Sequence, residues 1–165
     1  MRVSDSVEVG ATPQEVWDYL SEPENYLRFM SGVTRWEIAG DQRSGLGARF
    51  RMLIRVGAAE VGGLIEFVEW SEPRDMAWTS VTGVDQRGRW RIRELPDGRS
   101  RVEMRYAYGV AGAGLFGWLS ERVAAPTIGR HLRRTLHQLK RQVEHQRLRE
   151  EAERRRRARE AAAAG

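Results

Sequence analysis

Apolar and polar residues alternate with a period of two at the start of the chain. Val3, Val7 and Val9 fall on one side of this alternation, and Asp5 interrupts the same side. The residues between them are serines and a glutamate. The pattern predicts a strand over residues 3–9.

Two short helices are expected next. Thr12 is placed to cap the first helix, Pro13 suits its first position, and Glu15 completes a capping box. Its apolar stripe consists of Val16, Trp17 and Leu20. Residues 21–24 start the second helix by the same logic, and Gly32 ends it. Its predicted inner face consists of Tyr26, Leu27 and Met30.

Between residues 33 and 110 the period of two returns in six segments with one apolar and one charged side. The apolar sides are Trp36/Ile38, Phe50/Met52/Ile54/Val56, Ile65/Phe67, Met76/Trp78, Trp90/Ile92 and Val102/Met104/Tyr106/Tyr108. The predicted breaks between segments are residues 45–47, Gly57, residues 72–75, Gly88 and residues 96–98. This pattern predicts an antiparallel sheet with one face in solvent.

The apolar spacing then becomes helical. The predicted stripe consists of Leu119, Val123, Ile128, Leu132, Leu136, Leu139 and Val143. Pro126 inside this stretch predicts a kink or a split into two helices. Beyond the stripe, i,i+4 pairs that can hold a solvated helix are Glu150/Arg154, Glu151/Arg155 and Glu153/Arg157.

A long helix with an apolar stripe must be covered, and the inner face of the sheet is the large apolar surface that the chain offers. A strongly twisted sheet wrapped around one helix leaves a gap where its strands diverge. We therefore expect an α+β fold in which about seven curved antiparallel strands surround a C-terminal helix, with two short helices after the first strand. The gap is a natural hydrophobic cavity.

Composition excludes several classes of site. Of 165 residues 41% are hydrophobic, which is enough for a packed core, and the chain has no cysteine for disulfides or thiolate chemistry. Its three histidines all lie in the last 35 residues, so we expect no metal site and no cofactor. No apolar run reaches the roughly 20 residues of a membrane span, and the N-terminus lacks an apolar signal core. We expect a cytoplasmic protein.

The positive charge is concentrated at the C-terminus. The net charge is +5, and residues 145–165 contribute +3 from seven arginines and four glutamates, which leaves +2 for residues 1–144. A nucleic-acid surface more usually places a basic face on the folded body. We therefore expect no nucleic-acid partner and at most a transient membrane contact.

Four stretches resemble the START/Bet v 1-like (SRPBCC) superfamily, which has the helix-grip fold, in its bacterial polyketide cyclase/dehydrase branch. They are residues 7–20, residues 21–33, residues 90–102 and residues 136–144. The resemblance implies a domain over residues 1–144 with a cavity for a hydrophobic small molecule, followed by an Arg/Glu/Ala-rich extension over residues 145–165. The superfamily includes lipid carriers, aromatase/cyclases and coenzyme Q-binding proteins, so the fold alone does not fix the activity.

The inward-facing residues of the sheet and helix are the candidate ligand-binding set, because tyrosine and tryptophan offer a large ring with one polar atom. This set consists of Phe50, Met52, Ile54, Phe67, Trp78, Trp90, Ile92, Met104, Tyr106, Tyr108, Leu119 and Val123. The alternative is that the same residues form a filled core. Candidate catalytic groups are few, namely Tyr106, Tyr108 and His131.

Two further segments have competing interpretations. The glycine-rich residues 109–118, with Phe116 and Trp118, are either a mobile lid or membrane-touching patch, or a connection that packs on the first helices. The arginines at 154–157 either bind an anionic partner or belong to a solvated helix, and the glutamates among them favour the second interpretation.

Three functions follow, in order of preference. The first is a carrier or sensor that binds a lipid, an isoprenoid or a polyketide-like molecule. The second is a cyclase/aromatase-like enzyme that uses the same cavity, and the third is an interaction protein that contacts nucleic acid, the ribosome or a partner through its tail. The third gains support if the outer sheet face carries a continuous basic stripe. The arginines predicted on that face are Arg49, Arg51, Arg55, Arg89, Arg91, Arg93, Arg101 and Arg105, with Glu37, Glu66 and Glu103 between them.

Overall fold

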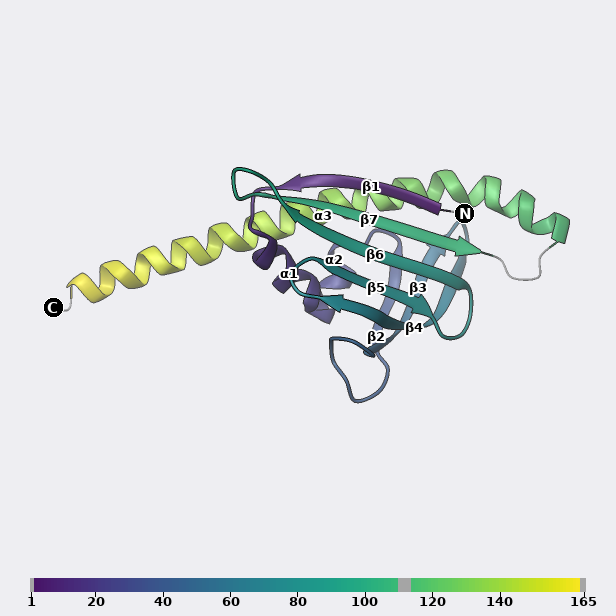
Figure 1. Ribbon diagram of the computed structural model, residues 1–165, viewed down its shortest axis with the longest axis horizontal. Helices are drawn as coiled ribbons and strands as arrows, with labels where there is room; N and C mark the ends of the chain where they lie inside the picture. The colour runs from purple at the N-terminus through teal and green to yellow at the C-terminus, as the bar shows by residue number, and fades with distance from the viewer. Residues whose placement is uncertain (1, 110–113, 164–165) are drawn as a thin grey trace.

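The computed structural model is a seven-stranded antiparallel sheet with one very long helix across its inner face (Figure 1). It describes the backbone of residues 2–109 and 114–163, and the side chains of these residues except those at 114–125. The elements are β1 (Arg2–Val9), α1 (Pro13–Ser21), the 3₁₀ turn η1 (Pro23–Asn25), α2 (Tyr26–Phe29), β2 (Val33–Ile38), β3 (Arg49–Val56), β4 (Ala59–Ser71), β5 (Asp75–Ser80), β6 (Asp85–Glu94), β7 (Ser100–Gly109) and α3 (Gly114–Ala163).

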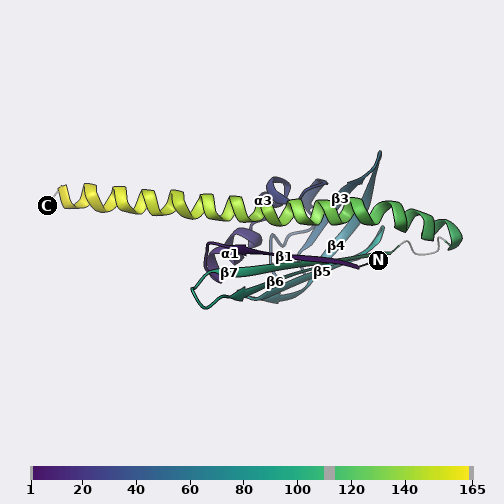
Figure 2. The same ribbon diagram turned by 90° about the horizontal axis from the view of Figure 1, so that it is seen from above.

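The strand order is β1-β7-β6-β5-β4-β3-β2, and every neighbouring pair is antiparallel. The first strand therefore lies beside the last, and the other strands form a meander. Figure 2 shows the sheet curled on one side of α3, with α1 near the middle of the helix and the C-terminal part of α3 extending past the sheet. The predicted helix-grip fold is confirmed.

The capping box at the start of α1 forms as predicted. The Thr12 hydroxyl accepts a hydrogen bond from the Glu15 backbone N–H at 3.3 Å, and the Glu15 carboxylate accepts one from the Thr12 N–H at 2.7 Å. Both bonds satisfy N–H groups that have no partner within the helix. The helix thereby turns its predicted stripe into the core.

The inner face of the second helix differs from the predicted one. It consists of η1 and a single α-helical turn, in which Tyr26, Phe29 and Met30 are buried while Leu27 is 54% exposed. Residues at i, i+3 and i+4 share one side of a helical turn, so Phe29 rather than Leu27 lies beside Tyr26. Ile38, at the end of the edge strand β2, is also exposed instead of inward.

Gly88 is not a break between strands, as the sequence had suggested, but lies inside β6 opposite Trp78 of β5. A Cβ atom on Gly88 would come within 1.9 Å of the Trp78 ring, so only glycine lets the indole lie flat on this part of the sheet. The chain instead reverses at residues 81–84, where Gly83 has φ +86° and packs closely on Gly62 and Gly63.

Helix α3 continues through Pro126 as one helix of 50 residues, so the predicted split does not occur. Packing on the sheet outweighs the local preference, since the described stripe of α3 is buried. Its members are Ile128, Leu132, Leu136, Leu139 and Val143. Polar contacts also attach α3 to the end of β1 and the residue that follows it: Lys140 donates to the Glu8 carbonyl at 2.8 Å, and Glu144 accepts a hydrogen bond from the Gly10 N–H at 2.7 Å.

The extension of α3 is solvated, and its ion pairs differ from those predicted. Arg147 pairs with Glu151 at 3.1 Å and Arg156 with Glu160 at 3.4 Å, in place of the three predicted Glu-to-Arg pairs. Exposed side chains on a helix can reach a partner in either direction, which sequence spacing does not decide. None of the described helices has the length and apolar character that a membrane span needs.

Candidate functional site

A small cavity lies between the inner face of the sheet and α3. Its volume is about 20 Å³. It is lined by Met30, Ser31, Met52, Ile54, Met104, Tyr106, Ile128, His131, Leu132 and Thr135. Three parts of the fold thus meet there: the chain after α2, the strands β3 and β7, each next to an edge strand of the sheet, and one face of α3.

The periodicity of each element explains why these side chains converge. Met52 and Ile54 of β3 are two residues apart and point inward, as do Met104 and Tyr106 of β7. On α3, the lining residues recur at steps of three or four and form one side of the helix.

Methionine dominates the wall of this cavity, with Met30, Met52 and Met104 all 6% exposed or less. The described cavity has room for about one water molecule. Methionine has an unbranched and flexible side chain that readily adapts to irregular shapes. A wall of this kind can make space for an apolar guest by changing rotamers.

A polar cluster closes the cavity on the side of α3. The Ser31 hydroxyl lies 2.9 Å from Nδ1 of His131, and the Ser31 backbone N–H donates to the Thr135 hydroxyl at 2.9 Å. The imidazole lies against Gly32, where a Cβ would be 2.8 Å from the ring. Burial, together with the positive charges of Arg134 and Arg130, lowers the pKa of His131. The imidazole is therefore neutral at pH 7 and can accept a proton.

A second polar group lies behind the wall on the side of the sheet. The Tyr106 hydroxyl donates a hydrogen bond to Oε1 of Gln86, which is 1% exposed. Burial, and to a lesser degree the neighbouring Tyr108, raises the pKa of Tyr106. The hydroxyl therefore keeps its proton at any physiological pH.

The predicted ligand-binding set is divided between this cavity and a solid core. Met52, Ile54, Met104 and Tyr106 line the cavity. Five others lie 2% exposed or less in the core, namely Phe50, Phe67, Trp78, Trp90 and Ile92. Tyr108 is half-buried, with its ring 6.1 Å from that of Tyr106. The side chains of Leu119 and Val123 lie outside the described residues, as do those of Phe116 and Trp118.

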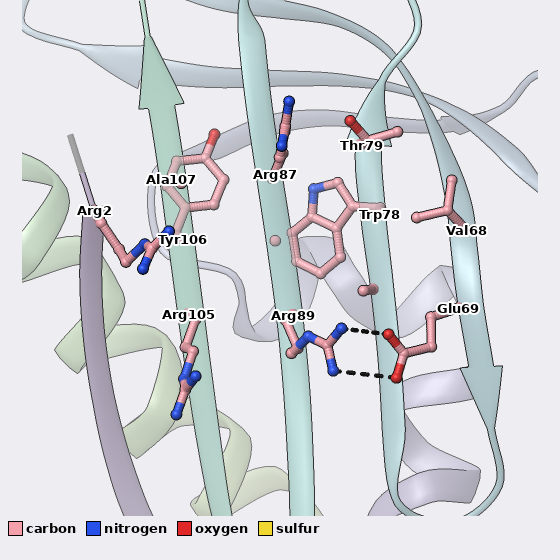
Figure 3. Close-up of a pocket in the computed structure, with 12 residues that line it drawn as sticks. Arg2, Val68, Glu69, Trp78, Thr79, Arg87, Arg89, Arg105, Tyr106 and Ala107 are labelled. Carbon is pink, nitrogen blue, oxygen red and sulfur yellow. Dashed lines mark hydrogen bonds and ion pairs between the residues drawn. The ribbon is translucent and has the colours of Figure 1, made fainter.

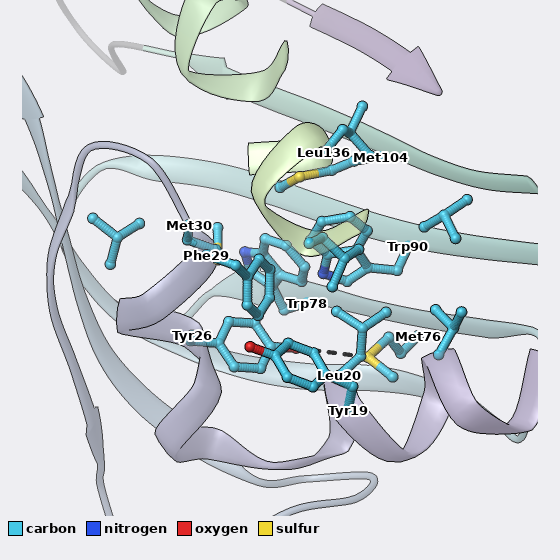
Figure 4. Close-up of a cluster of buried hydrophobic side chains, with 14 of the residues drawn as sticks. Tyr19, Leu20, Tyr26, Phe29, Met30, Met76, Trp78, Trp90, Met104 and Leu136 are labelled. Carbon is cyan, nitrogen blue, oxygen red and sulfur yellow. Dashed lines mark hydrogen bonds between the residues drawn. The ribbon is translucent and has the colours of Figure 1, made fainter. Parts of the chain in front are cut away.

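Aromatic rings from the short helices fill that core. Figure 4 shows Tyr19, Tyr26 and Phe29 facing Trp78 and Trp90 of the sheet. The Phe29 and Trp90 ring centres lie 6.0 Å apart at an interplanar angle of 62°. Ring contacts at such distances and angles characterise a close-packed interior rather than an open pocket.

Of the three catalytic candidates, Tyr106 and His131 meet at the cavity, whereas Tyr108 does not line it. Sequence reasoning missed Ser31, Thr135 and Gln86. For Gln86 a signal existed: it lies two and four residues before Gly88 and Trp90, on the same inner side of β6. Because Gly88 was interpreted as a break between strands, the alternation was not extended back from Trp90 to Gln86.

The outer face of the sheet is a network of ion pairs. A depression of about 430 Å³ lies there. Among its lining residues, Arg89 forms a two-pronged pair with Glu69 (Figure 3). Seven of the eight predicted arginines have carboxylate partners: Arg49 with Glu66, Arg55 with Glu60, Arg89 with Glu69 and Asp75, Arg91 and Arg93 with Asp75, Arg101 with Glu8, and Arg105 with Glu103. These carboxylates interrupt the continuous basic stripe on which the interaction hypothesis depends.

The solvent side of α3 carries a basic surface that the sequence analysis did not single out. A shallow depression of about 530 Å³ is lined there by Arg130, Arg133, Arg134, His137, Gln138 and Arg141. Arg133 also pairs with Asp5 at 3.8 Å. Asp5, which interrupts the apolar side of the first strand, thus faces α3 and forms an ion pair with Arg133.

Comparisons with known proteins agree with this architecture. Residues 1–144 match the family model described as polyketide cyclase / dehydrase and lipid transport. No curated protein matches the chain by sequence.

Solved structures share the fold at low identity. TTHA0849 from Thermus thermophilus is 19% identical, with a TM-score of 0.74 over 87% of this chain and 97% of that one. The Zhui aromatase/cyclase from Streptomyces sp. R1128 is 19% identical, with a TM-score of 0.71 over 87% and 93%. A START superfamily protein from Mycobacterium smegmatis is 17% identical, with a TM-score of 0.65 over 86% and 98%.

Proposed function

Because the chain belongs to the polyketide cyclase / dehydrase and lipid transport family, we propose that it binds a hydrophobic small molecule between its sheet and α3. The guest is a lipid, an isoprenoid or a polyketide-like molecule, and the protein acts as its carrier or sensor. The observation that carries the proposal is the methionine-lined cavity. Ligand pockets are typically apolar walls with a few polar groups, which is the composition of this wall.

A binding role is preferred to catalysis because few groups at the cavity can move a proton. His131 is the sole imidazole among the described lining residues, and none of those residues is a carboxylate. The raised pKa of Tyr106 makes its hydroxyl a hydrogen-bond donor rather than a base.

A matched pair of tryptophan substitutions on α3 tests the site. Leu132 lies in the cavity wall at 5% exposure, whereas Leu148 lies farther along the same helix at 64% exposure. Leu132→Trp fills the space that a guest would enter, and Leu148→Trp adds the same side chain to solvent. We expect the apolar fluorescent probe N-phenyl-1-naphthylamine to bind wild type and Leu148→Trp equally, and Leu132→Trp at least about tenfold more weakly.

Thermal unfolding of both variants shows whether each remains folded, since overpacking alone costs about 1–3 kcal/mol. Equal probe binding by a folded Leu132→Trp variant would place the probe elsewhere and contradict the proposal. Native mass spectrometry of protein purified from its own host, followed by solvent extraction, then identifies the natural guest. An empty protein that also fails to bind the probe would mean that the inner residues are core alone.

A cyclase-like activity is the second candidate, and the meeting of Tyr106 and His131 at one cavity favours it. In that case the neutral His131 imidazole takes a proton from a carbon between two carbonyls, and the few hydroxyl groups of the wall bind the resulting enolate. The test is turnover of a poly-β-ketone thioester by His131→Gln. Lost turnover with unchanged binding of the substrate supports catalysis, and absent turnover by the wild type supports the carrier.

A further inference from the structure

Four buried N–H donors on the inner side of the sheet have no hydrogen-bond partner among the described residues: Nε1 of Trp36, Trp78 and Trp90, and Nε2 of Gln86. Two of them, on Gln86 and Trp78, belong to residues near Tyr106, which lines the cavity. Gln86 and Trp78 are each 1% exposed. Buried polar groups normally have a partner, and an acceptor on a bound ligand would supply one for these two donors.

Tyr106 lines the cavity, and the fold places Gln86 and Trp78 behind it rather than in the wall itself. Gly88 of β6 is paired with Trp78 on one side and with Tyr106 on the other, so the three residues form one row across β5, β6 and β7. Figure 3 shows the Tyr106 hydroxyl and the Trp78 indole nitrogen both turned toward the end of β6 where Arg87 lies. Gln86 is the next residue along that strand.

The hydrogen bond from Tyr106 fixes which end of the Gln86 amide remains free. The Tyr106 hydroxyl donates to Oε1, so Oε1 is occupied and the NH₂ group is left over. The nearby Ser80 hydroxyl accepts from the Gln86 backbone N–H at 3.2 Å and not from its side-chain NH₂ group. The site therefore offers donors and lacks acceptors.

We propose that Gln86, with Trp78, is the specificity-determining group of the cavity and selects hydrophobic ligands that carry a neutral hydrogen-bond acceptor, such as a ketone, ester or quinone oxygen. This inference rests on the proposed function, since the ligand must enter between the sheet and α3. A neutral oxygen fits better than a carboxylate, because the neighbouring arginines of β6 point to the outer face and cannot balance a buried charge.

Two fluorescent probes of similar size separate the acceptor requirement from apolar binding. One is 6-propionyl-2-(dimethylamino)naphthalene, which carries a ketone, and the other is N-phenyl-1-naphthylamine, which has no oxygen. Gln86→Met keeps the length of the side chain and removes the donor. The matched control is Gln142→Met on the exposed side of α3.

We expect Gln86→Met to weaken binding of the ketone probe about tenfold, the effect of one neutral hydrogen bond, and to change binding of the amine probe less than about twofold. Gln142→Met should bind both probes like the wild type. Equal loss for both probes, or loss for neither, would overturn the inference and leave the cavity intact. If the wild type binds neither probe, the proposed function itself fails.

A measurement on the unmodified protein covers the case in which Gln86→Met does not fold. The infrared stretching band of the ¹³C-labelled ketone reports hydrogen bonding directly. A band below its position in a solvent without donors supports the inference. A band at that position in the bound probe would refute it.

Discussion

Two neighbouring groups of inward side chains use the same alternation for different purposes. In the aromatic group, next to α1 and α2, flat rings such as Phe29, Tyr26 and Trp90 fill the interior with contacts between ring faces and edges. In the methionine group, on the side of α3, the inward positions include Met52 and Met104, the latter directly opposite Trp90, and a cavity remains. Rigid rings specify one packing, whereas thioether chains admit several. The aromatic group therefore holds the fold, and the methionine group can adapt to a guest.

The largest expected loss of stability comes from removing a ring of the aromatic group. Trp90 is fully buried, so Trp90→Ala should lower the free energy of unfolding by about 3–5 kcal/mol. Met104→Ala should lower it by about 2 kcal/mol, the low end of the usual range, since neighbouring methionines can relax into the space. Urea unfolding of both variants measures the difference. If Met104→Ala lost more unfolding free energy than Trp90→Ala, the comparison between the aromatic and methionine groups would be reversed.

Two glycine substitutions should change the free energy of unfolding by an intermediate amount, one lowering it and the other raising it. Gly88→Ala places a Cβ 1.9 Å from the Trp78 ring and should destabilise the protein by about 1–3 kcal/mol. Gly129 lies inside α3 with open space around its Cβ position, so Gly129→Ala should stabilise by about 0.5–1 kcal/mol through helix propensity. Thermal unfolding of the two variants checks both signs. A neutral Gly88→Ala would show that the Trp78 ring can move aside.

Titration of His131 should give a smaller effect. Its pKa is lowered in the folded protein, so the unfolded chain binds more protons on this residue as the pH falls through its unfolded pKa near 6.5. The contribution to stability is full above pH 6.5 and is lost progressively below it. His131→Gln should therefore flatten the dependence of the unfolding free energy on pH between about 7.5 and 5. Urea unfolding at several pH values measures this slope, and an unchanged slope in His131→Gln would contradict the prediction.

The smallest effect is expected from shortening α3. Removing residues 152–165 should change the free energy of unfolding by less than about 0.5 kcal/mol, because the described side chains of this segment, at 152–163, are exposed. Removing residues 146–165 should cost more, since Arg147 donates to the Gly10 carbonyl and lies 3.8 Å from Glu15. Urea unfolding of the two truncations thus tests the predicted boundary at residue 144. Equal stability of both would place the end of the domain there.

Local patterns were sufficient to predict the architecture but not the details of the site. Alternation and the capping signals at Thr12 and Glu15 act within a few residues, and both features were confirmed. The contact between Ser31 and His131 joins residues 100 positions apart, and no periodicity reveals it. Gly88 was misassigned because its partner, the Trp78 ring, comes from another strand.

The pairing of the first strand with the last has a consequence for how the chain acquires its structure. Arg2 is in register with Ala107, and Val9 with Ser100, so β1 has no partner until about a hundred residues have been synthesised. Contacts between such distant positions make folding slow, typically milliseconds to seconds for sheets of this kind. Helix α3 is made later still, and the part of the apolar inner face that α1 and α2 do not cover stays exposed until then. The nascent chain is therefore most prone to aggregate just before its last third is complete.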